Sequence, residues 1–239
     1  MIVVVSQPMF LPWIGLFEQA RLADRFVHYD DVQLPQGRNF ITRVQIKTPA
    51  GTQWLSVSID RGRSGKTIAE THLVGDGDWR ERHLSLLREH YRSATHAAEM
   101  LELAESIYGW DGDNLADLNI FAFERIARWL GLEADFVRSS ALPVAGSGSE
   151  RLLGICNHFE ATEYLTGHGA ANYLDHQMFE SAGIGVSYMD YALAAYPQLH
   201  GEFIPYVSIL DAIANTGAGC RELLTSATTD WRAFLRTRA

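Results

Sequence analysis

The chain has 239 residues, 47% of them hydrophobic, so it is long enough to bury a full core. Its formal net charge of −9, from 20 Lys and Arg against 29 Asp and Glu, predicts repulsion of a nucleic-acid backbone and argues against nucleic acid as a partner. Two distant cysteines, Cys156 and Cys220, exclude a disulfide framework, and no segment resembles a signal peptide or approaches the ~20 apolar residues of a membrane span, so we expect a cytoplasmic protein.

The N-terminal segment predicts a strand, a loop, a helix and a second strand. Residues 2–5 are an uninterrupted β-branched run, which is typical of a strand buried on both faces of a parallel sheet. Two prolines delay the helix until Trp13, after which apolar residues recur at helical spacing as far as Ala23. A second apolar run, residues 26–29, completes a strand–helix–strand unit.

Polar side chains follow both of these predicted strands. Gln7 comes soon after the first, and Asp30 and Asp31 end the second. In open α/β sheets ligands bind at the carboxyl ends of the strands, where polar groups are held by a rigid sheet. Any one of the three side chains could instead cap a helix or a turn. Two such strand ends side by side favour a binding site.

The middle of the chain first alternates and then becomes helical. Residues 39–47 and 54–59 alternate apolar with polar side chains around a turn at 48–51, which predicts a β-hairpin, and residues 67–74 are read as a further strand. Antiparallel strands after a parallel opening predict a mixed sheet. Residues 78–131 carry three amphipathic helices, and Gly131 suits a left-handed helix cap.

The last third returns to alternating strands and helices. The expected strands are 135–138, 163–165 and 186–188, and the expected helices are 150–159, 173–182 and 207–213. We therefore predict one α/β domain over residues 1–239, with a mixed, mainly parallel sheet of Rossmann-like character, a β-hairpin and a helical insertion at about 78–131.

Few residues point to chemistry on their own. Cys156 lies on the apolar face of its predicted helix, where a buried cysteine is usually inert. The nine histidines form no HxxxH pair, so we expect no metal ligands. His90 and Tyr91 end a predicted helix, and an imidazole there suits a general base or a structural contact at the core edge.

Near the C-terminus, polar groups, most of them uncharged, cluster around two prolines in the stretch YPQLHGEFIPYVSILDAIANTG. They suit hydrogen bonding to a hydroxyl-rich or amide ligand, although a proline-ordered loop on a helix is the simpler interpretation. The residues concerned are Tyr196, Gln198, His200, Tyr206, Asp211 and Asn215.

The opening stretch SQPMFLPWIGLFEQARLADRFVHYDDVQ resembles the signature of the WbqC-like protein family. NFITRVQIKTPAGTQWLSV, the pair His90 and Tyr91, LADLN, SERLLGIC, EATEYLTGHGAANYLD and IPYVSILDAIANTG follow in the family's order, so the resemblance spans nearly the whole chain. One departure is the segment after Tyr91, where RSATHAA puts His96 in place of an expected aromatic residue. This change bears on the local pocket and on the acceptor.

The resemblance implies a role in polysaccharide or O-antigen biosynthesis or in natural-product biosynthesis, with members described as transferases. Some contexts imply transfer of an acyl or aminoacyl group to an amine. The positions that match the family pattern are Gln7, Asp31, Gln33, Arg43, His90, Tyr91, Asn119, Arg151, Tyr196, Gln198, Asp211 and Asn215.

These inferences lead to one hypothesis and two alternatives. The first is an amide-forming acyl or aminoacyl transferase that needs no cofactor, with a carrier-protein thioester or similar donor and a sugar nucleotide or natural-product intermediate as acceptor. His90 is the expected base, oriented by Asp31. The alternatives are a glycosyltransferase with a cation on Asp30 and Asp31, and a non-catalytic module that binds a carrier protein or sugar nucleotide.

In the first hypothesis, the remaining side chains bind the reacting groups. Gln7, Asn119 and Tyr91 are expected to donate hydrogen bonds to the carbonyl oxygen. Arg43 and Arg151 are expected to hold a phosphate of the sugar nucleotide or of a pantetheine arm.

Overall fold

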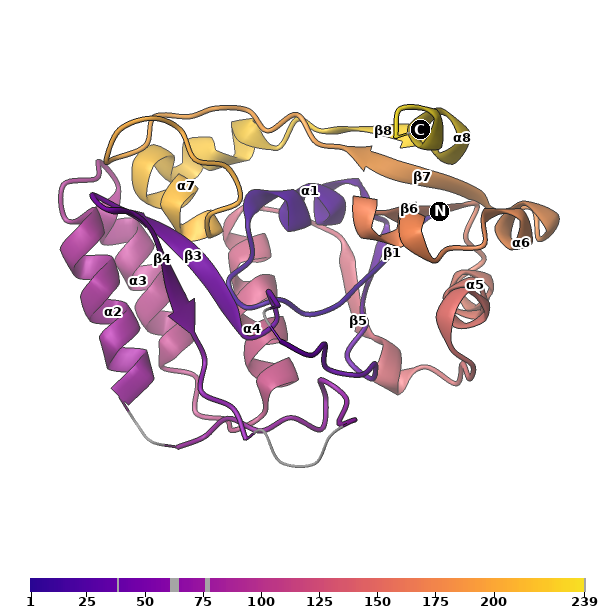
Figure 1. The fold of residues 1–239 in the computed structure, drawn as a ribbon, viewed down its shortest axis with the longest axis horizontal. Helices are drawn as coiled ribbons and strands as arrows, with labels where there is room; N and C mark the ends of the chain where they lie inside the picture. The colour runs from indigo at the N-terminus through magenta and orange to yellow at the C-terminus, as the bar shows by residue number, and fades with distance from the viewer. Residues whose placement is uncertain (38, 61–64, 76–77, 239) are drawn as a thin grey trace.

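A six-stranded sheet forms the centre of the computed structural model, which describes residues 1–37, 39–60, 65–75 and 78–238 (Figure 1). Five strands are parallel and the last, at one edge, is antiparallel. In spatial order the strands are β5 (Asp135–Arg138), β2 (Arg25–His28), β1 (Ile2–Ser6), β6 (Glu163–Thr166), β7 (Gly185–Asp190) and β8 (Ala227–Asp230). The predicted mixed, mainly parallel sheet is confirmed.

Side chains of β1 alternate between two hydrophobic clusters, one on each face of the sheet. Val4 belongs to the cluster formed with α1 (Ile14–Leu22) and α4 (Leu115–Trp129). Val3 and Val5 belong to the cluster on the opposite face. That face is covered by α5 (Gly148–His158), α6 (His176–Ser181) and α8 (Trp231–Arg236). The β-branched run therefore forms a strand because both of its faces are buried.

The order of the strands creates a switch point between β1 and β6. From β1 the chain passes through α1 to β2, and later through α4 to β5, on one face. From β5 it crosses through α5 to β6 on the other face. Loops leaving β1 and β6 therefore diverge at the carboxyl ends of two neighbouring strands. In open α/β sheets this is where ligands bind.

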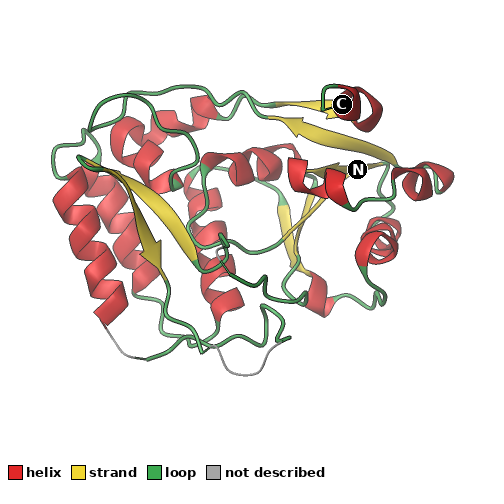
Figure 2. Cartoon of the chain, in the orientation of Figure 1, coloured by secondary structure: helices red, strands yellow, loops and turns green. Residues whose placement is uncertain are grey.

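The β-hairpin and the helical segment lie beside the sheet. β3 (Arg43–Thr48) and β4 (Gly51–Ser56) pair only with each other, as a separate two-stranded sheet. They lie next to α2 (Asp78–Tyr91) and α3 (Ala97–Tyr108) at one end of the molecule, away from α5 and α6 (Figure 2). α7 (Ile209–Thr216) packs against α3. The hairpin and the three helices were predicted correctly.

Two features differ from the sequence-based expectation. The segment 67–74 forms no strand and makes isolated bridges instead, for example between Ile59 and Leu73. The antiparallel member of the main sheet is β8 rather than the hairpin. Within the described residues, no helix combines the length and apolar character that a bilayer crossing requires.

Candidate functional site

Gln7 and the two aspartates do lie at the carboxyl edge of the sheet. Tyr29 donates its backbone N–H to the carbonyl of Ser6 at 2.8 Å, which holds the end of β2 beside the end of β1. Gln7 is half-buried, and its side chain has no hydrogen-bond partner among the described residues. An amide at a switch point with open donors and acceptor is available to a ligand.

Asp30 and Asp31 have different roles. Asp30 is 1% exposed and accepts hydrogen bonds from the backbone N–H and the hydroxyl of Ser140, at 3.0 and 2.8 Å, so it fixes the turn after β5. Asp31 is more accessible and pairs with the Arg151 guanidinium, with the Ser139 hydroxyl 2.6 Å from its other oxygen. Asp30 is therefore structural, whereas Asp31 and Arg151 present an ion pair at the edge.

The Arg151 guanidinium lies close to an aromatic ring and has unused donor capacity. Its carbon is 5.7 Å from the centroid of the Tyr29 ring, and its buried Nε has no partner among the described residues. Burial raises the pKa of Tyr29, and the positive charge of Arg151 opposes the rise. Ion pair and ring together form a polar cluster, defined as Tyr29, Asp31, Ser139 and Arg151.

His168 follows β6 at the same edge, and the sequence analysis missed it. Its Nε2 lies 2.7 Å from the carbonyl oxygen of Met189, and because a carbonyl only accepts, Nε2 carries the hydrogen. The exposed ring packs against Tyr191 and Phe234, with centroids 5.1 and 4.8 Å away. In this tautomer Nδ1 keeps its lone pair. The signal that could have found it is the polar His168 shortly after a predicted strand, which is the same pattern that pointed to Gln7.

His90 lies elsewhere. It is near the end of α2, where its carbonyl accepts a hydrogen bond from His200 Nε2 at 2.8 Å and the two imidazole rings are perpendicular at 6.4 Å. Within the described part of the chain, His90 and Asp31 share no hydrogen bond or ion pair. The structure thus does not join these two residues as the expected catalytic pair.

Asp211 is the centre of a buried network rather than part of an open site. It is 1% exposed and accepts hydrogen bonds from the hydroxyls of Tyr91 at 2.8 Å and Tyr196 at 2.9 Å. Burial raises the pKa of Asp211, and these two hydrogen bonds oppose the rise. Buried Lys47 donates from its ammonium group to the carbonyls of Gly201 and Glu202.

Gln198 and Asn215 extend this network into the loop between β7 and α7. Gln198 Oε1 accepts from the backbone N–H of Ile204 at 2.8 Å, and Asn215 Oδ1 accepts from that of Leu199 at 3.2 Å. Their polar groups are therefore used in holding the loop. The four predicted site residues Tyr196, Gln198, Asp211 and Asn215 do converge, but as a structural network.

The remaining predicted residues are dispersed. Asn119 is buried and donates to the carbonyls of Pro8 at 3.0 Å and Ile41 at 2.9 Å, which clamps the loop after β1. The Arg43 guanidinium lies 4.0 Å from the Trp54 ring centroid on the hairpin. Gln33 is exposed in an isolated bridge. Among the predicted residues, therefore, only Gln7, Asp30, Asp31 and Arg151 belong to the edge of the sheet.

A groove runs between the start of α1 and the loop after β7. It is a shallow groove whose two adjoining parts have cavity volumes of only about 20 and 10 Å³ and share Trp13, Ile14, Leu193 and Ala194. The Trp13 indole lies over Gly15, where an added Cβ would come within 2.1 Å of a ring carbon. This contact explains the glycine of the LPWIG motif. The other lining residues are Gly15, Glu18, Tyr191, Tyr196, Phe203, Pro205, Tyr206, Val207, Ser208, Ile209, Ala212, Leu223 and Ser226.

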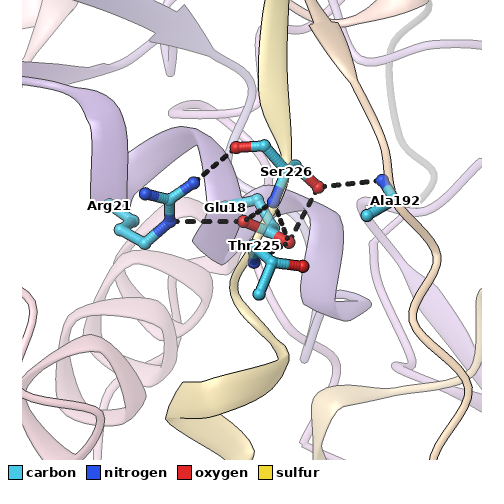
Figure 3. Close-up of polar contacts among 5 residues, drawn as sticks. All are labelled: Glu18, Arg21, Ala192, Thr225 and Ser226. Carbon is cyan, nitrogen blue, oxygen red and sulfur yellow. Dashed lines mark hydrogen bonds and ion pairs between the residues drawn. The ribbon is translucent and has the colours of Figure 1, made fainter.

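Glu18 of α1 fixes one wall of this groove (Figure 3). Its buried carboxylate accepts from the backbone N–H groups of Thr225 and Ser226 at 3.0 and 3.1 Å and from the Ser226 hydroxyl at 2.8 Å. Arg21 pairs with the same carboxylate at 3.4 Å, and Ala192 donates its N–H to the Ser226 hydroxyl at 3.1 Å. The helix is thus tied both to the approach to β8 and to the loop after β7.

Neither cysteine suits a nucleophile. Both thiols are buried, and burial raises the pKa of Cys156 and of Cys220 to about 12. At neutral pH such a thiol stays protonated and unreactive. Over the described ranges of the chain, no group of three or more His, Cys, Asp or Glu side chains has the geometry of a metal site.

Comparisons with known proteins identify relatives of this chain. The family model described as "WbqC-like protein family" matches residues 7–222. The chain is 35% identical over 225 residues to the uncharacterized protein Rv1507c of Mycobacterium tuberculosis (strain ATCC 25618 / H37Rv), covering 93% of this chain and 96% of the relative. The search of solved structures finds no match.

Proposed function

Because the chain belongs to the WbqC-like protein family, we propose that it is a transferase that forms an amide bond. It moves an acyl or aminoacyl group from an activated donor, such as a carrier-protein thioester, to an amine of a sugar nucleotide or natural-product intermediate in the cytoplasm. Its place is in polysaccharide or natural-product biosynthesis. The observation that carries the proposal is His168, a fixed-tautomer imidazole at the same sheet edge as the polar cluster and next to Tyr191 of the groove.

The proposed reaction needs a base and a positioned donor but no protein nucleophile. The amine nitrogen attacks the thioester carbonyl, His168 Nδ1 takes the proton that the nitrogen loses, and the thiolate departs with that proton. The products are an amide and a free thiol. A thioester is already activated, so this sequence agrees with a chain whose two thiols are buried and protonated.

The polar cluster supplies the binding groups in this scheme. Arg151 is suited to a phosphate of a sugar nucleotide or of a pantetheine arm, because guanidinium and phosphate form charge-assisted hydrogen bonds. The Gln7 amide is suited to the carbonyl oxygen that becomes negative in the transition state. Asp31 keeps the guanidinium at the edge.

The test is turnover with a panel of acyl and aminoacyl pantetheine thioesters and amino-sugar nucleotides, with amide formation followed by mass spectrometry. His168→Ala should lower turnover by a factor on the order of 10²–10⁴, as expected for loss of a general base. His90→Ala is the matched control and should stay within a few-fold of the native rate. A hundredfold loss of turnover in His90→Ala, with no loss in His168→Ala, would identify His90 on α2 as the base instead. Ligand binding without any turnover would favour a binding module.

A further inference from the structure

A cavity of about 420 Å³ opens at the amino end of the sheet, away from the candidate site. Arg21, in the last turn of α1, and Gly131, directly after the C-cap of α4, lie on its walls. Both segments lead into the first residues of strands, β2 and β5, whereas Gln7 and His168 follow the last residues of β1 and β6. The residues that line the cavity are Arg21, Gly131, Leu132, Glu133, Arg221 and Leu224.

Arg221 brings an unpaired guanidinium to this cavity. Acidic side chains outnumber basic ones in the chain, 29 to 20, yet the Arg221 side chain forms no hydrogen bond or ion pair with any described residue. The group nevertheless packs closely against the backbone, because a Cβ added at Gly131 would lie 2.9 Å from the guanidinium carbon and from Nη1. Its N–H donors are therefore held in place and remain available to a ligand.

Capping the end of α4 is a simpler role for Arg221, but the backbone already provides that cap. Leu132 donates its N–H to the carbonyl of Ala127 at 2.9 Å, and Gly131 donates its N–H to that of Arg128 at 2.9 Å, as in a Schellman motif. Among the described residues, the guanidinium has no hydrogen bond to these carbonyls. The helix end therefore does not use the donors of Arg221.

Arg21 brings a second guanidinium to the same cavity (Figure 3). Its Nε lies 3.4 Å from the Glu18 carboxylate and its Nη2 donates to the carbonyl of Ser226, which leaves Nη1 without a partner among the described residues. Two guanidinium groups suit a phosphate, because each can donate charge-assisted hydrogen bonds to it. Glu18 offsets part of the charge of Arg21, so Arg221 should contribute more of the attraction.

The other walls of the cavity indicate what else the ligand carries. Glu133 is exposed and, within the described chain, pairs with neither arginine. Its carboxylate repels a bare anion but accepts hydrogen bonds from hydroxyl groups. Leu132 and Leu224 offer apolar surface to C–H groups. The cavity therefore suits a phosphate ester with a hydroxylated carbon skeleton better than inorganic phosphate.

We propose that Arg21 and Arg221 bind the phosphate of a hydroxylated phosphate monoester in this cavity, with Glu133 accepting hydrogen bonds from its hydroxyl groups. The cavity and the carboxyl edge of the sheet are separate, so binding here does not depend on the transferase activity proposed above. A bound ligand joins α1, the turn after α4 and the segment before β8, and it thereby stabilises the folded chain.

The experiment compares two phosphate monoesters by titration calorimetry. Ribose 5-phosphate carries hydroxyl groups and ethyl phosphate does not, so ribose 5-phosphate should bind about tenfold more tightly to the native protein. Arg221→Gln should weaken the binding of both by about tenfold or more, because it removes a charge-assisted contact. The exposed control Arg92→Gln should change neither. Glu133→Ala should abolish the preference for ribose 5-phosphate.

A pair of glycine variants tests how the guanidinium is held. In Gly131→Ala the new Cβ would displace the Arg221 guanidinium, so the affinity for ribose 5-phosphate should fall several-fold. Gly183→Ala is the matched control, because Gly183 also has a positive φ, +77°, but meets no atom within 4 Å. Its affinity should match that of the native protein. Equal losses in the two variants would mean that the contact with Gly131 does not position the guanidinium.

Three results would overturn the assignment: no binding of either ester, unchanged affinities in Arg221→Gln, or equal affinities of the native protein for the two esters. Binding that is lost in Arg151→Gln but kept in Arg221→Gln would likewise overturn it, because the phosphate would then lie at the carboxyl edge. Circular dichroism of each variant verifies that it folds.

Discussion

His83 is a buried histidine whose protonation is linked to folding. It is 2% exposed among Phe10, Trp79 and Tyr108, with its Nδ1 3.1 Å from the Tyr108 hydroxyl. Burial, aided by the charge of Arg82, lowers the pKa of His83 from 6.5 to about 4. Between these two pH values the unfolded chain binds a proton that the folded chain does not.

The free energy of unfolding should therefore fall as the pH drops from about 6.5 to about 4, by roughly 3 kcal/mol from His83. Urea unfolding at several pH values measures this slope. His83→Gln should reduce it, and the exposed control His158→Gln should not. Identical slopes in the native protein and His83→Gln would contradict the linkage.

At the level of single residues, the sequence located part of the candidate site and missed the rest for a physical reason. Gln7 and Asp31 were found because each follows an apolar strand, which is a local pattern. Arg151 was named only through the family resemblance, and its pairing with Asp31 was not predicted, because the two residues lie 120 positions apart and no local pattern encodes that contact. Asp211 was predicted as a site residue because it is a polar residue near tyrosines. In the structure the hydroxyls of Tyr91 and Tyr196 donate hydrogen bonds to it in the core, so these groups are not available to a ligand.

At the level of elements, Glu18 joins α1 to the start of β8 (Figure 3). Glu18→Gln keeps the size of the side chain but turns an amide N–H₂ group toward backbone N–H donors. The free energy of unfolding should fall by about 2–3 kcal/mol, the cost of a lost buried charge-assisted hydrogen bond. Glu89→Gln, on the exposed side of α2, should change it by less than about 0.5 kcal/mol.

Hydrogen exchange locates that effect. The amides of Thr225 and Ser226 should exchange faster in Glu18→Gln, because their acceptor is lost. Unchanged protection of these amides would refute the role given to the carboxylate.

The first turn of α1 supports a second prediction about an element. Gly15→Ala improves helix propensity by up to about 1 kcal/mol, but the new Cβ would meet the far end of the Trp13 indole at 2.1 Å. The helix should persist while the indole swings out. Acrylamide should then quench tryptophan fluorescence more strongly. Gly219→Ala, which meets no atom within 4 Å, is the control, and equal quenching in the two variants would contradict this packing.

A helix or strand could be predicted where its own residues carry the apolar pattern that defines it. Buried strands such as β1 and amphipathic helices such as α4 carry their own patterns, and Gly131 indeed takes a left-handed cap with φ of +68°. Residues 67–74 alternate like a strand but find no continuous partner. β8 is a strand of only four residues, and it forms because β7 has a free edge with which it can pair. Which strand pairs with which is therefore set by the fold and cannot be predicted from the local sequence.

At the level of the whole molecule, the order of the strands decides which residues meet. The spacing of apolar runs predicted a mainly parallel sheet but not the crossing from β5 to β6, which sets the switch point. That crossing puts the ends of β1 and β6 side by side, so His168, which follows β6, lies at the same carboxyl edge of the sheet as Gln7. It also leaves the carboxyl end of α2, with His90, beside the loop of residues 191–208.

The contacts of Asp30 and Asp31 at the carboxyl edge of the sheet predict that catalysis is insensitive to chelators. A glycosyltransferase of the alternative kind would hold a divalent cation on Asp30 and Asp31, but Asp30 already accepts from Ser140 and Asp31 is paired with Arg151. A guanidinium beside the carboxylate repels a cation and competes for the same oxygens. Turnover of the active transferase should therefore stay within about twofold after dialysis against EDTA.

Arg151→Gln provides the complementary measurement. Loss of the guanidinium frees an Asp31 oxygen, so this variant should bind manganese more tightly than the native protein does, as measured by calorimetry with the metal alone. Its affinity for a sugar nucleotide should fall at least tenfold, because a charge-assisted contact to phosphate is lost. Native activity that disappears with EDTA and returns with manganese or magnesium would instead favour glycosyl transfer and remove Arg151 from the phosphate-binding role.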